Sequence, residues 1–296
     1  MPELRPLDLL ICFREAPAPL DFVLPGMVAG TVGLIVGMGS AGKSMLALQI
    51  GLSVAAGRDL FGVLGADPTP GRVVYLSAED QGPILHHRLF GMAEAIPEDV
   101  RAQIAERFDV VPVYGLGISI NAETVKGPTG EPMRSPWGAV MTFCEGARLV
   151  ICDTLIRFAG GRSENSNVEM AEMMNHVEIT TRQTGAAFLM IHHIGKAVGR
   201  DGTGGSDQTA TRGASALTDN ARWQANLSVM TKEDGERRGY DGDERKRFVS
   251  FEITKQNYGQ GIPQVWLERG EHGILRQGEP NEPQARGGRN NGEGRL

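Results

Sequence analysis

The chain has 296 residues, a formal net charge of -6 and 41% hydrophobic residues. This length and composition are typical of a globular protein with a large core, arranged as one big domain or two smaller ones. The acidic balance argues against a protein whose whole surface coats nucleic acid, because such proteins carry a basic field. A local basic groove is compatible with this charge.

Membrane and redox signals are weak. No apolar segment approaches the roughly 18 residues needed to cross a bilayer, and the short apolar run at Leu9 to Phe13 is flanked by Asp8 and Arg14. The cysteines are Cys12, Cys144 and Cys152. They have no metal-ligand spacing, and Cys152 lies in an apolar run that should be core. We expect a reduced, soluble, cytoplasmic protein without membrane association.

Strand and helix patterns alternate along most of the chain. The predicted strands are Thr31 to Val36, Arg72 to Ser77, Phe108 to Val113, Arg148 to Cys152 and Ala186 to Ile191. The predicted helices are Lys43 to Ala56, about Ile84 to Ala95, one from about Trp137, and Val168 to Thr184. This alternation predicts an α/β fold with a mostly parallel central sheet flanked by helices.

The remaining segments break this pattern. Residues 115–136 are rich in glycine, proline and polar residues without a period, so we expect an exposed loop. Ala221 to Met230, Phe248 to Thr254 and Gln264 to Leu267 are predicted strands added antiparallel at a sheet edge. We expect residues 1–278 to form a single domain and residues 279–296 to be a disordered tail.

A phosphate-binding motif opens the first long helix. Residues 37–44 match G-x-x-x-x-G-K-[ST] in full, after a predicted strand. Glycines let backbone N–H groups point at phosphate oxygens, and the helix N-terminus adds favourable partial charge. Lys43 would reach the β- and γ-phosphates, and Ser44 would ligate Mg²⁺. The predicted nucleotide-binding residues are Gly37, Gly39, Ser40, Ala41, Gly42, Lys43 and Ser44. An incidental glycine-rich turn is the disfavoured alternative.

Carboxylates follow two predicted strands. Asp153 comes directly after four apolar residues, where a second Mg²⁺ ligand belongs, although a turn or helix-cap residue is the alternative. Glu79 and Asp80 follow a strand that we place next to the loop strand, in the crevice where ligands bind in open α/β sheets. We assign Glu79 as the general base for the attacking water. The alternative is that both residues cap the next helix.

This constellation resembles the RecA-like ATPases, in which the catalytic Glu follows the second strand and a polar residue ends the strand after the Asp. The chain more closely resembles the hexameric RepA-type replicative helicases of mobilisable broad-host-range plasmids. The resembling segments are LDFVLPGMVAGTVG, GSAGKSMLALQ, VVYLSAED, HHRL, DTL-x-RF, the paired histidines, DNARWQ and K-x-NYG. They run from about residue 17 to residue 266, nearly the whole chain.

The resemblance implies ATP and Mg²⁺ as cofactors and roles for several side chains. It implies Lys43 and Ser44 for phosphate and Mg²⁺, Asp153 for the metal, and Glu79 as base. His193, more than His192, corresponds to the γ-phosphate sensor. A zinc site at the two histidines is the alternative, disfavoured because adjacent strand residues point to opposite faces.

Three basic residues correspond to intersubunit positions. Arg222 corresponds to the arginine finger that reaches a neighbouring subunit's nucleotide, a contact that can be worth roughly 10³–10⁵ in rate. Lys255 is a second candidate for this role, and Arg88 is a further candidate for an intersubunit contact. A surface salt bridge is the alternative for Arg222 and Lys255.

DNA contact is expected in the segment after His193. The segment contains three basic residues, Lys196, Arg200 and Arg212, and two acidic residues, so its net positive charge is small. In a ring of subunits this charge would be repeated around one central channel. Glycines let backbone N–H groups meet phosphates directly. The segment from Gly160 to Asn167, with Arg162, is a second candidate, and plain exposed connections are the alternative for both. Residues 232–247 hold six basic and six acidic side chains, which predicts a solvated face.

The phosphate-site residues predict an ATPase, and the resemblance implies an ATP-dependent DNA helicase that translocates on single-stranded DNA as a homohexameric ring. The resemblance implies work in plasmid or mobile-element replication, with a plasmid initiator or a primase as candidate partner. The alternative is a DNA- or protein-regulated RecA-like ATPase switch, recombinational or regulatory, without unwinding. A non-enzymatic ATP-binding protein is a further alternative, disfavoured because a pure binder has no use for Glu79, Asp153 and Arg222 together.

Overall fold

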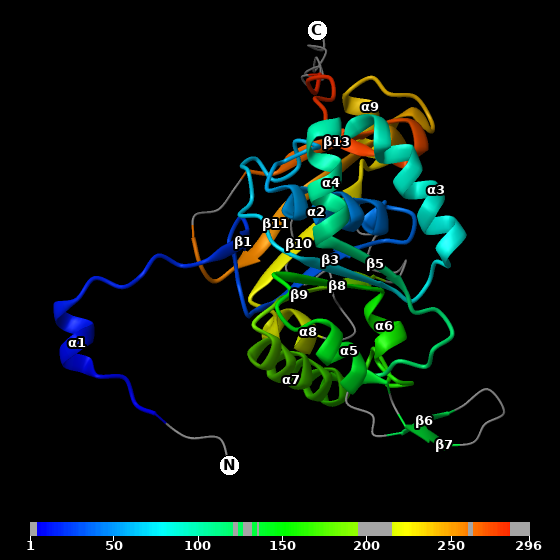
Figure 1. The fold of residues 1–296 in the computed structure, drawn as a ribbon. Helices are drawn as coiled ribbons and strands as arrows, with labels where there is room; N and C mark the ends of the chain where they lie inside the picture. The colour runs from blue at the N-terminus through cyan, green and yellow to red at the C-terminus, as the bar shows by residue number, and fades with distance from the viewer. Residues whose placement is uncertain are drawn as a thin grey trace, which may run out of the picture.

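A nine-stranded sheet forms the centre of the computed structural model, which describes residues 5–120, 124–126, 132–134, 136–194, 215–259 and 263–284 (Figure 1). Its strands are β3 (Val32–Gly37), β4 (Val73–Ser77), β5 (Phe108–Pro112), β8 (Leu149–Asp153), β9 (Ala187–His193), β10 (Trp223–Val229), β11 (Phe248–Gln256), β12 (Val265–Arg269) and β13 (Leu275–Gln277). Their order across the sheet is β13-β12-β11-β10-β3-β9-β8-β4-β5.

The directions of the strands confirm the predicted fold class. All neighbours from β10 to β5 are parallel, and β11, β12 and β13 add antiparallel. The prediction that Ala221 to Met230 would be an antiparallel addition is wrong, because β10 pairs in parallel with β3. An apolar run does not tell the direction of its neighbour, since parallel and antiparallel partners bury the same side chains.

The expected place of β4 is also wrong. The sequence predicted it next to the loop strand β3, but β9 and β8 lie between the two strands. Strand order is decided by the path of the helical crossovers, which an apolar run does not encode. Because the strands are parallel, the ends of β3, β4, β8 and β9 still meet at one edge of the sheet.

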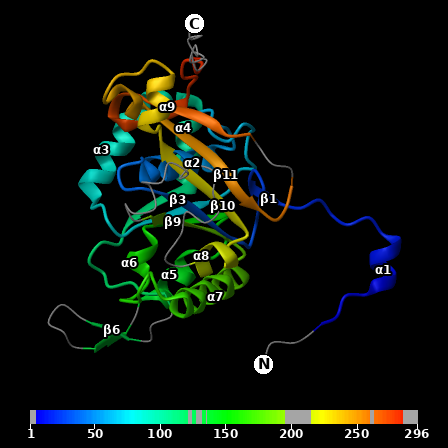
Figure 2. The same ribbon diagram turned by 180° about the vertical axis from the view of Figure 1, so that it is seen from behind.

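Helices cover both faces of the sheet (Figures 1 and 2). One face carries α2 (Lys43–Ala56), α3 (Gly82–Met92), the 3₁₀ turn Ala93–Ala95 and α4 (Glu98–Arg107). The other face carries α5 (Trp137–Phe143), α6 (Leu155–Phe158), α7 (Asn167–Thr184) and α8 (Ser215–Asn220). The fold therefore has two apolar layers, one on each side of the sheet.

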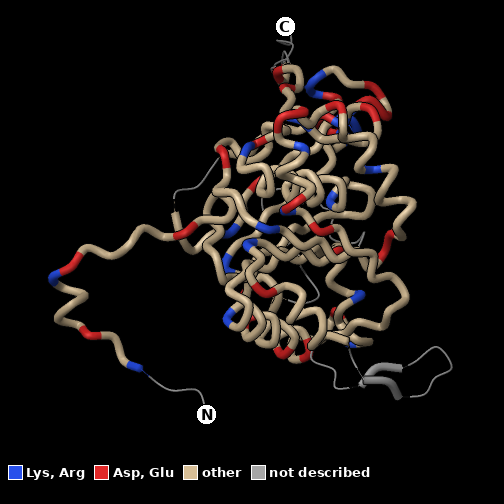
Figure 3. Tube along the Cα trace, in the orientation of Figure 1, with Lys and Arg blue, Asp and Glu red and all other residues tan. Residues whose placement is uncertain are grey.

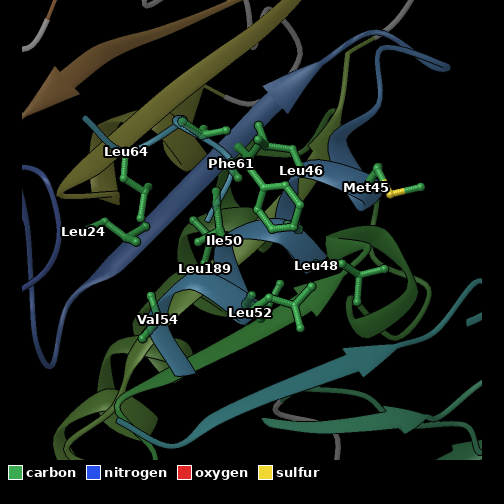
Figure 4. Packing of buried hydrophobic residues seen from close by; sticks show 14 of the residues in the cluster. Leu24, Met45, Leu46, Leu48, Ile50, Leu52, Val54, Phe61, Leu64 and Leu189 are labelled. Atoms are coloured by element: carbon green, nitrogen blue, oxygen red, sulfur yellow. The ribbon is translucent and has the colours of Figure 1, made fainter. Parts of the chain in front are cut away.

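The first of these layers is centred on α2, which is buried along almost its whole length. Leu46 and Ile50 of α2 pack with Leu189 of β9 and with Phe61 in this cluster (Figure 4). Each fully buried side chain of this size contributes roughly 1.5–3 kcal/mol. Gly57 ends the helix in the left-handed region, as its position in the sequence predicted. The phosphate loop that precedes α2 thus rests on a well-packed core.

Several short elements were not predicted from the sequence, among them α4, α6, α8 and β13. Helix α4 illustrates the reason, because only Ile104 of its ten residues is buried. Pro97 followed by Glu98 and Asp99 is a helix-start signal. A mostly polar helix lacks the apolar period on which the other predictions rested.

The expected exposed loop at residues 115–136 is wrong in two respects. Strands β6 (Thr124–Lys126) and β7 (Pro132–Arg134) pair antiparallel within it. Ile118 and Ile120 are buried in the layer of α5 to α8, and the Ile120 N–H donates to the Phe158 carbonyl. Two apolar residues two positions apart on an extended chain share one side, which suffices to anchor this segment.

The C-terminal tail is ordered further than expected. Residues 285–296 lie outside the described part of the chain, but residues 279–284 lie along α9 (Lys232–Arg237) and the turn that follows it. The Gln284 N–H donates to the Arg237 carbonyl, and the Asn281 N–H donates to the Tyr240 hydroxyl. These hydrogen bonds give partners to two backbone N–H groups of the segment. The composition of the segment had predicted disorder and no such partners.

The N-terminal arm projects from the body of the molecule before the hairpin of β1 (Phe22–Leu24) and β2 (Met27–Val28) (Figures 1 and 2). The arm contains α1 (Leu9–Arg14), which Asp8 caps and in which no residue is buried. Leu9 and Phe13 are 60% and 79% exposed. Among the described helices, none is both long and apolar enough to cross a membrane.

Candidate nucleotide site

The phosphate loop lies between the end of β3 and the start of α2, as the motif predicted. Gly42 has a φ of 103° and Ser40 a φ of 65°, both in the left-handed region. A Cβ on Gly37 would lie 2.4 Å from the Leu227 carbonyl oxygen of β10, so only glycine fits there. The glycines of the motif therefore set the tight path of the loop.

Lys43 is buried at the base of this loop and is only 3% exposed. Its Nζ donates to the Gly37 and Met38 carbonyls, both at 2.8 Å. Burial lowers the pKa of Lys43 to about 8, while the charges of Asp153 and Glu79 act in the opposite direction. A desolvated ammonium of this kind favours an anionic partner, and a phosphate group held by the loop would supply one.

The C-terminal strands brace the loop and its helix. Arg269 of β12 donates from Nη2 to the Ser40 and Ala41 carbonyls at 3.1 and 2.9 Å. Gln49 of α2 exchanges two hydrogen bonds with the backbone of Leu275 in β13. Neither contact was predicted, because the partners are 226 to 229 positions apart and no local pattern in the sequence links them.

Asp153 ends β8 and is 1% exposed. Its Oδ2 accepts a hydrogen bond from the Tyr75 hydroxyl, whereas its Oδ1 is buried without a hydrogen-bond partner in the described structure. An orphaned carboxylate oxygen fits a cation, and Ser44 lies half-buried in the first turn of α2. Within the described residues no cluster of three or more His, Cys, Asp or Glu forms a candidate metal site. Mg²⁺ suits this sparse set, because it takes few protein ligands and keeps phosphate oxygens and waters.

Glu79 lies just beyond the end of β4, with its side chain 36% exposed. Its carboxylate is 3.8 Å from Nε2 of His193 and 4.0 Å from Nε of Arg157. The structure thus brings the predicted base and the predicted sensor together. Arg157 was missed as a site residue, although it belongs to the DTL-x-RF segment.

The two histidines at the end of β9 lie in different surroundings. Burial and the charge of Lys43 lower the pKa of His193, while Glu79 acts against this shift. His192 faces the opposite layer, is 6% exposed, and has a pKa lowered by burial to about 4. Both shifts favour the neutral ring, and of the two histidines His193 is the one that lies 3.8 Å from Glu79.

Asp80 and Arg88 form an ion pair at 2.7 Å beside the nucleotide edge. The alternative that Asp80 caps the following helix is wrong, because Gln81 is the N-cap residue of α3. Arg88, predicted as an intersubunit candidate, thus has a partner on its own chain. This pairing holds α3 against the end of β4.

Arg222 and Lys255 lie at the other end of the sheet. Arg222 is exposed just before β10, and its backbone N–H donates to the Val32 carbonyl at the start of β3. Lys255 donates from Nζ to the Thr218 and Asp219 carbonyls at 2.6 and 3.0 Å. Burial lowers the pKa of Lys255, the charge of Asp219 acts against this shift, and the nearby charge of Arg222 adds to it. These two cations lie far from the phosphate loop of the same chain.

The predicted DNA-binding residues Lys196, Arg200 and Arg212 lie outside the described residues. In the second candidate segment, Arg162 donates from Nη1 to the Ile120 and Ala159 carbonyls at 3.1 and 2.8 Å. Arg162 therefore closes the turn after α6 with Nη1 of its guanidinium, which leaves fewer N–H donors for a DNA phosphate.

The mixed charges of residues 232–247 form ion pairs among themselves. Arg237 and Arg238 both pair with Asp234, and Lys246 pairs with Asp243. Figure 3 shows acidic and basic residues intermingled around α9. This arrangement agrees with a solvated face rather than a DNA-binding patch.

Known proteins resemble this chain in sequence and in fold. A family model described as AAA domain matches residues 2–199. One similar solved structure, described as an ATPase domain, has 16% identity and a TM-score of 0.59, over 86% of this chain and 87% of that chain. A DnaB-like replicative helicase, whose structure was described with its interactions with primase, has 14% identity and a TM-score of 0.58, over 84% of this chain and 57% of that chain. The likeness in fold agrees with the expected α/β arrangement, a mostly parallel central sheet with antiparallel strands added toward the C-terminus.

Proposed function

The chain belongs to the AAA domain family, and from this premise we propose that it is an ATP-dependent DNA helicase. In this proposal it translocates on single-stranded DNA as a homohexameric ring. The carrying observation is the placement of charged residues on one sheet: Lys43, Glu79 and Asp153 lie at one edge and Arg222 at the other. We propose residues 1–278 as one ATPase domain.

The carboxyl edge would bind the nucleotide and activate water. Lys43 would exchange its two loop carbonyls for β- and γ-phosphate oxygens. Ser44 and Asp153 would hold Mg²⁺, which supplies charge neutralisation to the phosphates. Glu79 would take the proton of the attacking water, as its exposed carboxylate allows. His193, 3.8 Å from Glu79, would register the γ-phosphate through this contact.

The opposite edge would complete the site of a neighbouring subunit. The register from Trp223 opposite Gly33 to Leu227 opposite Gly37 puts Arg222 five residues from the loop end of β3. At about 3.3 Å per residue this is roughly 16 Å, beyond the reach of an arginine side chain. Arg222 therefore cannot serve the nucleotide of its own chain. Arg222, with Lys255 beside it, would act in trans on transition-state charge.

The N-terminal arm supports assembly into a ring. Leu9, Leu10, Ile11 and Phe13 are each at least half exposed, on a helix that has no buried residue. An apolar surface of this kind marks a contact with another chain. The primase interaction described for the DnaB-like helicase supports a primase, or a plasmid initiator, as partner. A role in plasmid or mobile-element replication in the cytoplasm rests on the resembling sequence segments.

DNA would meet the ring at Lys196, Arg200 and Arg212 in the segment after His193. This segment follows the proposed γ-phosphate sensor directly, so a change at the sensor would pass to it along the chain. No aromatic residue lies between Ile194 and Leu217, so contacts would be to the phosphate backbone and insensitive to sequence. Binding of this type weakens steeply as salt concentration rises.

A DNA- or protein-regulated ATPase switch is the second candidate function, since a switch uses the same phosphate chemistry. Steady-state ATP hydrolysis with and without single-stranded DNA separates the two, with Lys43→Ala as the blank. We expect strong stimulation by DNA and strand separation on a tailed duplex. Turnover indifferent to DNA, or stimulated turnover without strand separation, would contradict the helicase and favour the switch.

A further inference from the structure

Tyr75 is a fully buried residue in the middle of β4, and its hydroxyl donates to Oδ2 of Asp153 at 2.5 Å. The register between β4 and β8 pairs Tyr75 with Ile151 and Ser77 with Asp153. Because side chains two residues apart share a face, Tyr75 and Asp153 lie diagonally on the same side of the sheet. A diagonal neighbour is within reach of a long aromatic side chain.

Packing alone does not explain why residue 75 is a tyrosine rather than a phenylalanine. The rest of the Tyr75 ring lies in the apolar layer under α2, where a phenylalanine ring would fill nearly the same volume. A buried hydroxyl is costly unless it is hydrogen-bonded, and Asp153 is the partner that it finds. Burial and the charge of Asp153 also raise the pKa of Tyr75, so the hydroxyl keeps its proton and remains a donor.

The bond leaves the two oxygens of Asp153 in different states. Oδ2 is engaged by Tyr75, and Oδ1 is buried with no partner among the described atoms. The terminal torsion of an aspartate is broad and soft, so without a fixed partner the carboxylate would rotate. A metal ligand performs best when a neighbouring hydrogen bond fixes its orientation.

We propose that Tyr75 is a positioning residue that presents Oδ1 of Asp153 to Mg²⁺. The inference rests on the proposed role of Asp153 as a magnesium ligand. Tyr75 itself touches neither metal nor nucleotide; it acts by holding Oδ2, so that one oxygen of the carboxylate always faces the site. The sequence offered a weak signal, because Tyr75 is the one residue of the buried run VVYL that carries a polar group.

Tyr75→Phe tests this role by removing one hydroxyl and keeping the ring. The measurement is binding of a fluorescent ATP analogue in EDTA and across a Mg²⁺ titration, followed by turnover over the same titration. We expect unchanged binding in EDTA and a Mg²⁺ half-saturation concentration raised roughly 10- to 100-fold. Turnover should recover at saturating Mg²⁺. Tyr240→Phe is the matched control, because its hydroxyl accepts from Asn281 away from the site.

A purely structural role for Tyr75 predicts a different result. It would lower the melting temperature and the amount of active protein, with no change in the Mg²⁺ half-saturation. That result, or a Tyr75→Phe variant indistinguishable from the parent chain, overturns the proposal. If nucleotide binding by the parent chain itself ignores Mg²⁺, the proposed role of Asp153 fails instead, so the two failures are distinguishable.

Fluorine NMR keeps the proposal testable if Tyr75→Phe does not fold. The chain has four tyrosines, all of which can be replaced by 3-fluorotyrosine. The Tyr75 resonance is then assigned by removing the others in turn with Tyr114→Phe, Tyr240→Phe and Tyr258→Phe. We expect the Tyr75 resonance to shift when Mg²⁺ is added to the nucleotide-bound protein. A resonance that does not respond to Mg²⁺ would overturn the inference.

Discussion

The two ends of the central sheet differ in how their charges are balanced. At the carboxyl edge, the buried cation Lys43 lies near Asp153 and Glu79, so both signs are present. At the other edge, the charge of Arg222 lowers the pKa of Lys255 and the carboxylate of Asp219 raises it, while burial of the lysine is the largest cause of its lowered pKa. Within the described residues neither of these two cations forms an ion pair with a carboxylate. The first edge therefore pairs a buried cation with two nearby carboxylates, and the second holds two neighbouring cations without a direct ion pair in the described part of the chain; this contrast agrees with the proposed division of the site between subunits.

Lys43 is the residue of the carboxyl edge whose loss should have the largest effect. In Lys43→Ala we expect ATP turnover to fall to background, because the charge that meets the β- and γ-phosphates is gone. The fold should survive, since the glycines that shape the loop are unchanged. Steady-state hydrolysis and thermal melting measure the two effects. Residual turnover near that of the parent chain would refute the assignment of the loop.

Arg222→Ala probes the opposite edge. We expect ATP binding to be retained and turnover to fall by roughly 10³–10⁵, the range for an arginine finger. Arg182→Ala, which removes an exposed arginine from the end of α7, is the control and should be neutral.

Mixing tests whether the arginine acts in trans. Arg222→Ala mixed with Glu79→Gln should recover part of the turnover, because some interfaces then combine an intact Glu79 with an intact Arg222. If no mixing ratio restores activity, the divided site is wrong.

Glu79→Gln tests whether Glu79 is the general base at the carboxyl edge. The amide keeps the size of the side chain but cannot accept the proton of water, so turnover should fall by roughly 10²–10⁴. Nucleotide binding by titration with a fluorescent ATP analogue should be unchanged. Undiminished turnover would remove Glu79 as the base and direct attention to Asp80.

The buried ring of His192 should make the free energy of unfolding depend on pH. Its pKa is about 4 in the folded chain, against about 6.5 when unfolded. The unfolded chain therefore takes up a proton first as pH falls, and the free energy of unfolding should drop between pH 6.5 and pH 4. The loss approaches roughly 3 kcal/mol at pH 4. The measurement is the free energy of unfolding by denaturant, taken across this pH range for the parent chain and for His192→Leu. We expect a shallower pH dependence in the variant, and equal slopes would contradict this.

Local patterns predicted the parts of the site that depend on neighbouring residues in the chain. The loop at residues 37–44, the helix that follows it and the carboxylates Glu79 and Asp153 were located from strand, glycine and charge patterns alone. The prediction failed where order across the sheet mattered, as for β4 and β10. It also failed for Ile118 and Ile120, whose apolar side chains are too few to form a period.

The phosphate loop and the alternation of strands and helices follow from the local sequence, because they depend on backbone preferences and periodicity within a few residues. Three placements depend on the folded chain: Tyr75 donates to Asp153, Arg269 donates to carbonyls of the loop, and Arg222 lies roughly 16 Å from the loop. Such contacts join residues far apart in the chain. Their geometry follows from strand order and crossover path, which no short segment encodes.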